Sequence, residues 1–149
     1  MRRAAIILIL LGGILIAPAG NLRAAVDLGK IEILKQFARK KILYNDSISV
    51  DSVISWSEQL LPVLKQHRYK KETYFLLQLQ LANAYTLRGD ISLAIDRARL
   101  MYEEAKETDY KFGLVVANQA IGDAYTIANQ SEKALDSYQD ALNLSLIHI

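Results

Sequence analysis

The sequence predicts an all-α protein built as an antiparallel helix-hairpin solenoid with about three hairpins. Apolar residues recur at helical spacing along most of the chain, which favours helices over strands. One segment repeats an earlier one with a period of about 40 residues, and both copies have the pattern helix, tight turn, helix. A single hairpin of this kind cannot bury its own apolar face, so we expect the hairpins to stack into a solenoid.

The composition of the chain excludes several classes of protein. Of its 149 residues, 52% are apolar and 23% are charged, which is typical of a folded domain with a packed core. The absence of cysteine excludes a disulfide framework, a cysteine zinc site and a thiol nucleophile. The two histidines, His67 and His148, lie far apart in the sequence. We therefore predict no catalytic, cofactor-binding or metal-binding residues and no enzymatic activity.

Residues 1–19 have the three parts of a secretory signal peptide. Arg2 and Arg3 precede an apolar run at positions 4–17, and the small residues Ala17 and Ala19 flank Pro18. As a helix the run would reach only about 21 Å, whereas the hydrocarbon core of a bilayer is roughly 30 Å thick. We expect cleavage after Ala19 and export to the periplasm or the outer face of the inner membrane of a bacterium. An uncleaved membrane anchor and a core helix remain alternatives.

Residues 20–71 are interpreted as N-terminal helices that include a degenerate repeat. Apolar residues at helical spacing predict a first helix over about 22–44. The polar stretch 44–49 predicts the connecting loop. A second helix is predicted to begin near Asp51, and Pro62 within it predicts a kink or an early end, because proline removes a backbone hydrogen bond.

Residues 72–149 contain the two matching repeats. Leu81–Leu87 of the first repeat aligns with Ile121–Ile127 of the second. Gly89 and Asn129 fall where a helix ends and a left-handed backbone conformation is needed. The residues that follow these turns, Asp90 and Ser131, are the expected N-caps of the second helices.

Small residues at matching positions predict close contact between helices. Alanine or glycine lets two helix backbones approach, and larger residues there would cost roughly 1–3 kcal/mol by overpacking. Ala117 lies outside these small positions. The tyrosines of the repeats are expected to be core residues that fill the helix crossings. The complete predicted framework is Ala82, Tyr85, Gly89, Ala94, Gly122, Tyr125, Ala134, Tyr138 and Ala141.

These residues resemble tetratricopeptide repeats over about residues 75–145. The repeat here is about 40 residues long, as in long-period bacterial variants, whereas the usual length is about 34. The proline common near the end of each repeat is replaced by the segment 106–109. The resemblance implies binding of a partner on the concave face of the first helices, without catalysis.

The resemblance also places specific residues in that groove. The candidate partner-binding residues are Asn83, Thr86, Leu87, Gln119, Asp123 and Thr126. The apolar positions Leu76, Leu79, Val116 and Ile127 would lie beside them. No lysine or arginine occupies these positions, so the groove should not hold a peptide C-terminal carboxylate. The expected partner is a protein, an extended or helical peptide, or another domain of the same intact protein.

The charge of the chain gives little reason to expect nucleic acid as a partner. Without residues 1–19, the chain has 16 basic and 16 acidic residues. The segment 20–71 is net basic and 72–149 is net acidic, which favours either end-to-end association or differently charged solvated faces. Glu103, Glu104, Glu107 and Asp109 are interpreted as solvated surface.

Two functional hypotheses follow. The C-terminal end lacks the polar character of a capping helix, so we interpret the chain as truncated there; its apolar residues are Leu142, Leu144, Leu146, Ile147 and Ile149. The first hypothesis is an exported helical-repeat scaffold that mediates protein–protein contact. The alternative is the extracytoplasmic sensor or input region of a membrane-bound signalling protein, a histidine kinase or a DNA-binding regulator. Membrane contact is expected only through the N-terminal segment or a missing C-terminal span.

Overall fold

The computed structural model describes residues 19–40, 48–66 and 70–146. Nearly all of residues 1–19, predicted as a signal peptide, therefore lie outside the described residues. The described segments form six helices and no strand. They are α1 (Ala19–Lys40), α2 (Val50–Gln66), α3 (Lys71–Arg88), α4 (Ile91–Glu107), α5 (Lys111–Ile127) and α6 (Ser131–Leu146).

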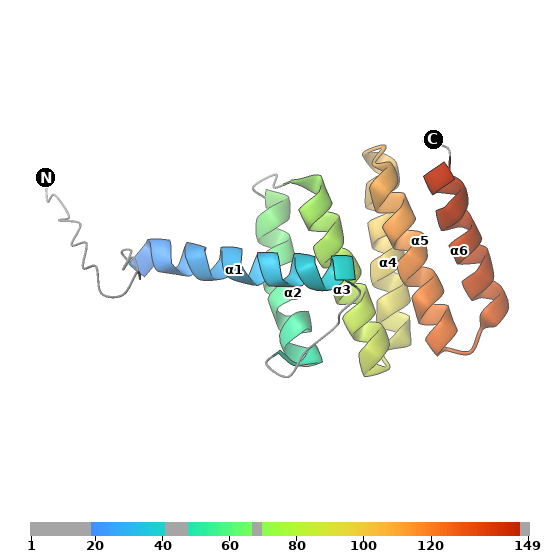
Figure 1. The fold of residues 1–149 in the computed structure, drawn as a ribbon, viewed down its shortest axis with the longest axis horizontal. Coiled ribbons are helices and arrows are strands. Elements are labelled where there is room, and N and C mark those ends of the chain that lie inside the picture. The colour runs from blue at the N-terminus through green and yellow to red at the C-terminus, as the bar shows by residue number, and fades with distance from the viewer. Residues whose placement is uncertain (1–18, 41–47, 67–69, 147–149) are drawn as a thin grey trace, which may run out of the picture.

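Helices α2 to α6 stack side by side, each antiparallel to the next (Figure 1). The pairs α3–α4 and α5–α6 are the two predicted repeats, and α4 packs against α5 to join them. The predicted class, an all-α helical-hairpin repeat fold, is confirmed. Two apolar clusters hold the stack together: one joins α1, α2 and α3 and also includes Ala94 of α4 and Ala124 of α5, and the other lies among α3, α4 and α5.

Helix α1 does not form the predicted hairpin with α2. It lies across α3, with its axis roughly perpendicular to the axes of α2 to α6, and it contacts α2 much less than α3 (Figure 1). Its apolar residues Ile31, Leu34 and Phe37 join the first apolar cluster. As a consequence, α3 is covered by neighbouring helices on most of its sides, and 13 of its 18 residues are buried.

Three turns between helices share one backbone geometry. Gly89, Asp109 and Asn129 have φ angles of 91°, 46° and 57°. At each turn, the N–H of the next residue donates to a carbonyl five residues back, as Tyr110 does to Ala105 at 2.8 Å. The left-handed residues Gly89 and Asn129 were predicted, whereas Asp109 was not, although aspartate tolerates this conformation better than most residues.

The predicted caps and the predicted end of α2 differ from the structure. Asp90 makes no side-chain cap bond and instead accepts a hydrogen bond from Arg88 at 2.6 Å. Ser131 is the first residue of α6 rather than its cap. Helix α2 continues past Pro62 to Gln66, because burial of apolar residues on both sides of the proline, such as Leu64, offsets the lost backbone hydrogen bond.

The small framework residues Ala82, Ala94, Gly122, Ala134 and Ala141 are buried. A Cβ on Gly122 would lie 2.6 Å from the ring of Tyr138, so glycine makes room for this ring. Ala117 is also fully buried, between α4 and α5, and the expectation that it lies outside the small positions is wrong.

The three framework tyrosines have different environments. Tyr85 is buried, and its hydroxyl donates to Glu58 of α2. Tyr125 is half-buried. Tyr138 is 36% exposed, so its interpretation as a core residue is wrong. No helix among the described residues covers the outer side of α6, and one side of Tyr138 therefore faces solvent.

Candidate partner-binding groove

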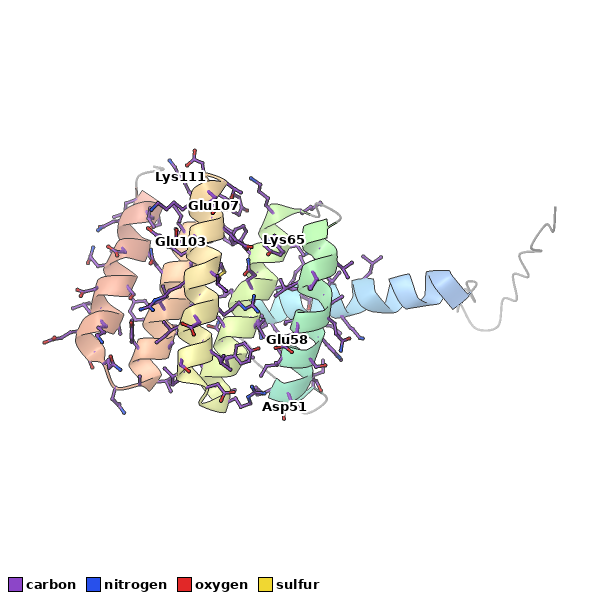
Figure 2. The ribbon with its side chains drawn as sticks, turned by 180° about the vertical axis from the view of Figure 1, so that it is seen from behind. Asp51, Glu58, Lys65, Glu103, Glu107 and Lys111 are labelled. Carbon is purple, nitrogen blue, oxygen red and sulfur yellow. The ribbon has the colours of Figure 1, made fainter. Side chains whose placement is uncertain are left out.

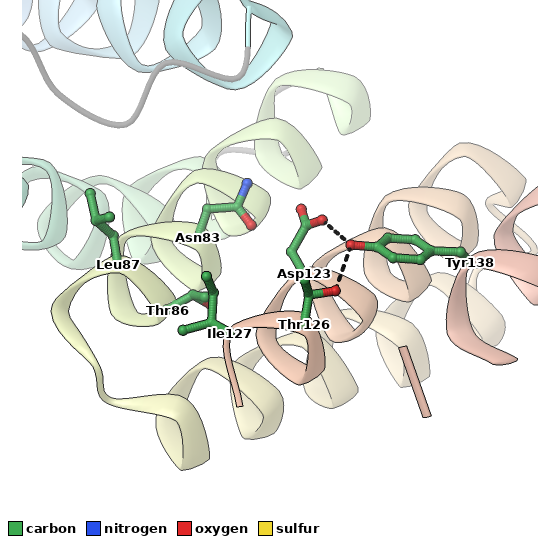
Figure 3. Close-up of a pocket in the computed structure, with 7 residues that line it drawn as sticks. All are labelled: Asn83, Thr86, Leu87, Asp123, Thr126, Ile127 and Tyr138. Carbon is green, nitrogen blue, oxygen red and sulfur yellow. Dashed lines mark hydrogen bonds between the residues drawn. The ribbon is translucent and has the colours of Figure 1, made fainter. Parts of the chain in front are cut away.

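A shallow cavity of about 250 Å³ lies on the surface between α3 and α5, which we call the inner groove (Figure 3). Its lining includes five of the six residues that the sequence predicted for partner binding. Each α3 residue is paired with its equivalent in the second repeat, on α5, and Tyr138 of α6 completes the wall. The lining residues are Asn83, Thr86, Leu87, Asp123, Thr126, Ile127 and Tyr138.

Hydrogen bonds fix one wall of the inner groove. The Tyr138 hydroxyl donates to Asp123 Oδ1 at 2.6 Å and lies 3.3 Å from Thr126 Oγ1. Figure 3 shows Tyr138 reaching from α6 toward Asp123 and Thr126 on α5. Burial and the hydrogen bond to Asp123 raise the pKa of Tyr138. The hydroxyl therefore keeps its proton at neutral pH and holds the Asp123 carboxylate in place.

The opposite wall contains a buried amide. Asn83 is 8% exposed, and its Oδ1 atom accepts no hydrogen bond. A buried acceptor without a donor is unfavourable by about 1–3 kcal/mol. Two exposed apolar residues, Leu87 and Ile127, lie beside this amide at the end of the inner groove.

The sixth predicted residue, Gln119, is not in this cavity. It lines a second cavity of about 270 Å³, also between α3 and α5, together with Leu76, Leu79 and Val116. Ala38 of α1 borders this second cavity. The sequence did not predict this contribution from α1, because helical spacing identifies the apolar face of a helix but not the helix on which that face packs.

A polar cluster on another side of α3 corrects one sequence interpretation. Glu104 of α4 accepts hydrogen bonds from Lys65, from Tyr74 at 3.0 Å and from Gln78 at 2.9 Å. Burial raises the pKa of Glu104, but these three hydrogen bonds outweigh it and lower the pKa below its ordinary value. Glu104 is therefore a tertiary link among α2, α3 and α4 rather than solvated surface.

The other members of that acidic stretch do face solvent. Glu103, Glu107 and Asp109 are exposed, and Figure 2 shows Glu103 and Glu107 on α4. Lys65 of α2 lies on the same face (Figure 2). The charged face formed by α2 and α4 thus differs in character from the inner groove between α3 and α5.

Metal-binding clusters and membrane-spanning helices are both absent from the described residues. No group of three or more histidine or acidic side chains there is arranged to hold a metal ion. None of the described helices combines the length and the hydropathy needed to cross a bilayer. Comparisons of the chain with family models, with curated proteins and with solved structures give no match.

Proposed function

We propose that this chain is a non-catalytic helical-repeat scaffold that binds a peptide, or an exposed segment of a partner protein, in its inner groove. The observation that carries the proposal is the pairing of groove residues across two repeats. Asn83, Thr86 and Leu87 on α3 lie beside Asp123, Thr126 and Ile127 on α5, and together they line one open cavity. Repeats that present equivalent positions along one face suit an elongated ligand.

The proposed family and location support the same function. The small residues and tyrosines of the two hairpins favour membership of the tetratricopeptide repeats, in which the first helices line a concave binding surface. The charged and apolar segments at positions 2–17 favour export to the periplasm or the outer face of the inner membrane. The partner would then be another exported protein or another domain of the same intact protein.

The inner groove can be tested with a pair of matched variants. A phage-displayed peptide library would be selected on the full chain, and the selected peptides measured by fluorescence anisotropy. Ile127→Arg places a long charged side chain in the inner groove, whereas Leu135→Arg makes the same kind of change on α6, outside it. Both residues are exposed, at 58% and 66%, so neither change should unfold the protein.

We expect Ile127→Arg to raise the Kd of the selected peptides at least about fivefold, because an interface anchor is typically worth more than about 1 kcal/mol. Leu135→Arg should change the Kd less than about twofold, since surface changes outside an interface have small effects. Equal weakening by the two variants, or weakening by neither, would exclude the inner groove as the binding surface.

A second candidate function is the extracytoplasmic input region of a membrane-bound histidine kinase or DNA-binding regulator. The exposure of Leu142 on α6 favours this second candidate. Leu142 occupies the position that Tyr102 occupies in α4, where Tyr102 packs against the apolar cluster of α3, α4 and α5. Leu142 is instead 49% exposed, so this side of α6 fits a further helix.

Sequencing the gene beyond the codon for Ile149 distinguishes the two candidate functions. A reading frame that continues through further repeats into a membrane span and an output domain would favour the input region. A stop codon after a polar helix would favour the free scaffold.

A further inference from the structure

The hydroxyl groups of the inner groove already donate hydrogen bonds within the protein. Thr86 Oγ1 donates to the carbonyl of Ala82 at 3.1 Å, and Thr126 Oγ1 donates to the carbonyl of Gly122 at 2.9 Å. The Tyr138 hydroxyl donates to Asp123. A ligand in the inner groove therefore meets hydroxyl groups whose protons already point into the protein.

The Asp123 carboxylate is an acceptor of the inner groove that remains open to a ligand. It accepts one hydrogen bond, from Tyr138, and an ionised carboxylate has about four acceptor positions. Asn83 lies at the equivalent position of the first repeat and faces the same cavity (Figure 3), but its Oδ1 atom is buried and out of reach of a ligand. The remaining acceptor positions of Asp123 would be satisfied by N–H donors from a ligand.

The charge of the inner groove favours a cation. Asp123 is the acidic residue among the seven that line it, and none of these seven described residues is basic. Leu87 and Ile127 expose apolar side chains in the same groove. An anionic group would lose its hydration there beside the like charge of Asp123, whereas a cation with several N–H groups would gain charge-assisted hydrogen bonds.

We propose that the inner groove selects a peptide segment in which a lysine or arginine lies next to an apolar residue. The basic head group contacts Asp123, and the apolar side chain packs on Leu87 and Ile127. The inference rests on the proposed function, because it names the chemistry of the partner for the same groove. The inference goes beyond the proposed function by predicting that the inner groove discriminates against neutral and acidic segments.

The test uses three small probes of different charge, two of which also share one shape. They are N-acetyl-leucyl-arginine amide, its neutral analogue with citrulline in place of arginine, and N-acetyl-leucyl-glutamate amide. Each is titrated into the full chain labelled with ¹⁵N, and the amide signals are followed by NMR. We expect the arginine probe to shift the signals of Asp123, Thr126 and Ile127 and to bind at least about fivefold more tightly than the citrulline probe. The glutamate probe should leave these signals unchanged.

Two isosteric variants show whether Asp123 is responsible. Asp123→Asn removes the charge but keeps an oxygen that accepts the hydrogen bond from Tyr138, and it should abolish the preference for arginine over citrulline. Asp136→Asn removes the same charge from the exposed surface of α6 and should keep the preference. Equal binding of the arginine and citrulline probes to the wild-type protein would overturn the inference, as would a preference that survives in Asp123→Asn or is lost in Asp136→Asn.

The result also separates this inference from the proposed function. If selected peptides bind in a manner sensitive to Ile127→Arg but are not enriched in lysine or arginine, the inference fails and the proposed function stands. If neither the selected peptides nor the probes bind at the inner groove, both fail.

Discussion

The two repeats share one sequence pattern but differ in how deeply they are buried. In the first repeat, most of α3 and a stripe of small residues and Met101 on α4 are buried. The second repeat buries fewer than half of the residues of α5 and only Ala134 and Ala141 of α6. Helix α3 is covered by α1, α2, α4 and α5, while α6 packs on α5 alone. The pattern of a repeat therefore decides which residues face other helices, and its place in the stack decides whether a helix covers them.

The largest expected difference between the repeats is the cost of truncating an equivalent core residue. Leu81 is fully buried, and its counterpart Ile121 is only partly buried. Leu81→Ala should destabilise the protein by about 2–5 kcal/mol, as is usual for a large-to-small change in a core. Ile121→Ala should cost about 1–2 kcal/mol because less apolar area is lost from burial. Urea unfolding midpoints measure both, and equal costs would contradict the comparison.

A smaller difference comes from the Glu104 cluster, because the equivalent position in the second repeat is Leu144. Glu104→Gln should destabilise the protein by about 1–2 kcal/mol at pH 7, since three donors lose a charged acceptor. Glu103→Gln removes the same charge from an exposed neighbouring position and is the control; it should cost less than about 0.5 kcal/mol.

The contribution of Glu104 to stability should depend on pH in a definite direction. The pKa of Glu104 is lower in the folded protein than in the unfolded chain. Its contribution to stability is therefore complete above the unfolded pKa of about 4.3 and is lost as the pH falls through the folded value. The advantage of the wild type over Glu104→Gln should shrink in urea titrations carried out from about pH 5 down to about pH 3. A difference that stays constant over this range would show that the charge of Glu104 is not involved.

The smallest expected effect is a gain at the turn between the repeats. Asp109 adopts a left-handed conformation that glycine adopts without steric cost. Asp109→Gly should stabilise the protein by up to about 1 kcal/mol. Gly89→Ala, at the turn between α3 and α4, should destabilise it by about 1 kcal/mol, since alanine disfavours a φ of 91°. Thermal unfolding of both variants tests the pair, and a loss of stability in Asp109→Gly would contradict it.

The sequence predicted the helices and the equivalence of the repeats because periodicity and small residues are local signals. The resemblance to the tetratricopeptide repeats also placed Asn83, Thr86, Leu87, Asp123 and Thr126 on one surface, and the structure brings these five residues together around one cavity. How α1 packs was not predictable in this way. The apolar face of α1 fits α2 or α3 equally well by its spacing, and only the shapes of the packed side chains decide between them.

Two further errors have the same physical origin. Tyr138 was expected in the core because it occupies a framework position of the repeat; its ring does contact Gly122 of α5, but it stays 36% exposed because no described helix packs beyond α6. Glu104 was assigned to solvent because it lies in an acidic stretch, and its partners Lys65, Tyr74 and Gln78 are 26 to 39 residues away in the sequence. Burial and pairing across such distances depend on tertiary contacts, which a local pattern does not contain.

The regular spacing of the turns has a consequence for how such a chain can evolve. Gly89, Asp109 and Asn129 recur at a constant interval of half a repeat, and α3, α4, α5 and α6 begin at the same interval. Duplication or deletion of any segment one repeat long would therefore join a helix to its equivalent in phase, with the turns and the buried alanines still aligned. The length of the array can change in a single genetic event, and each added repeat would extend the inner groove by one more trio of side chains.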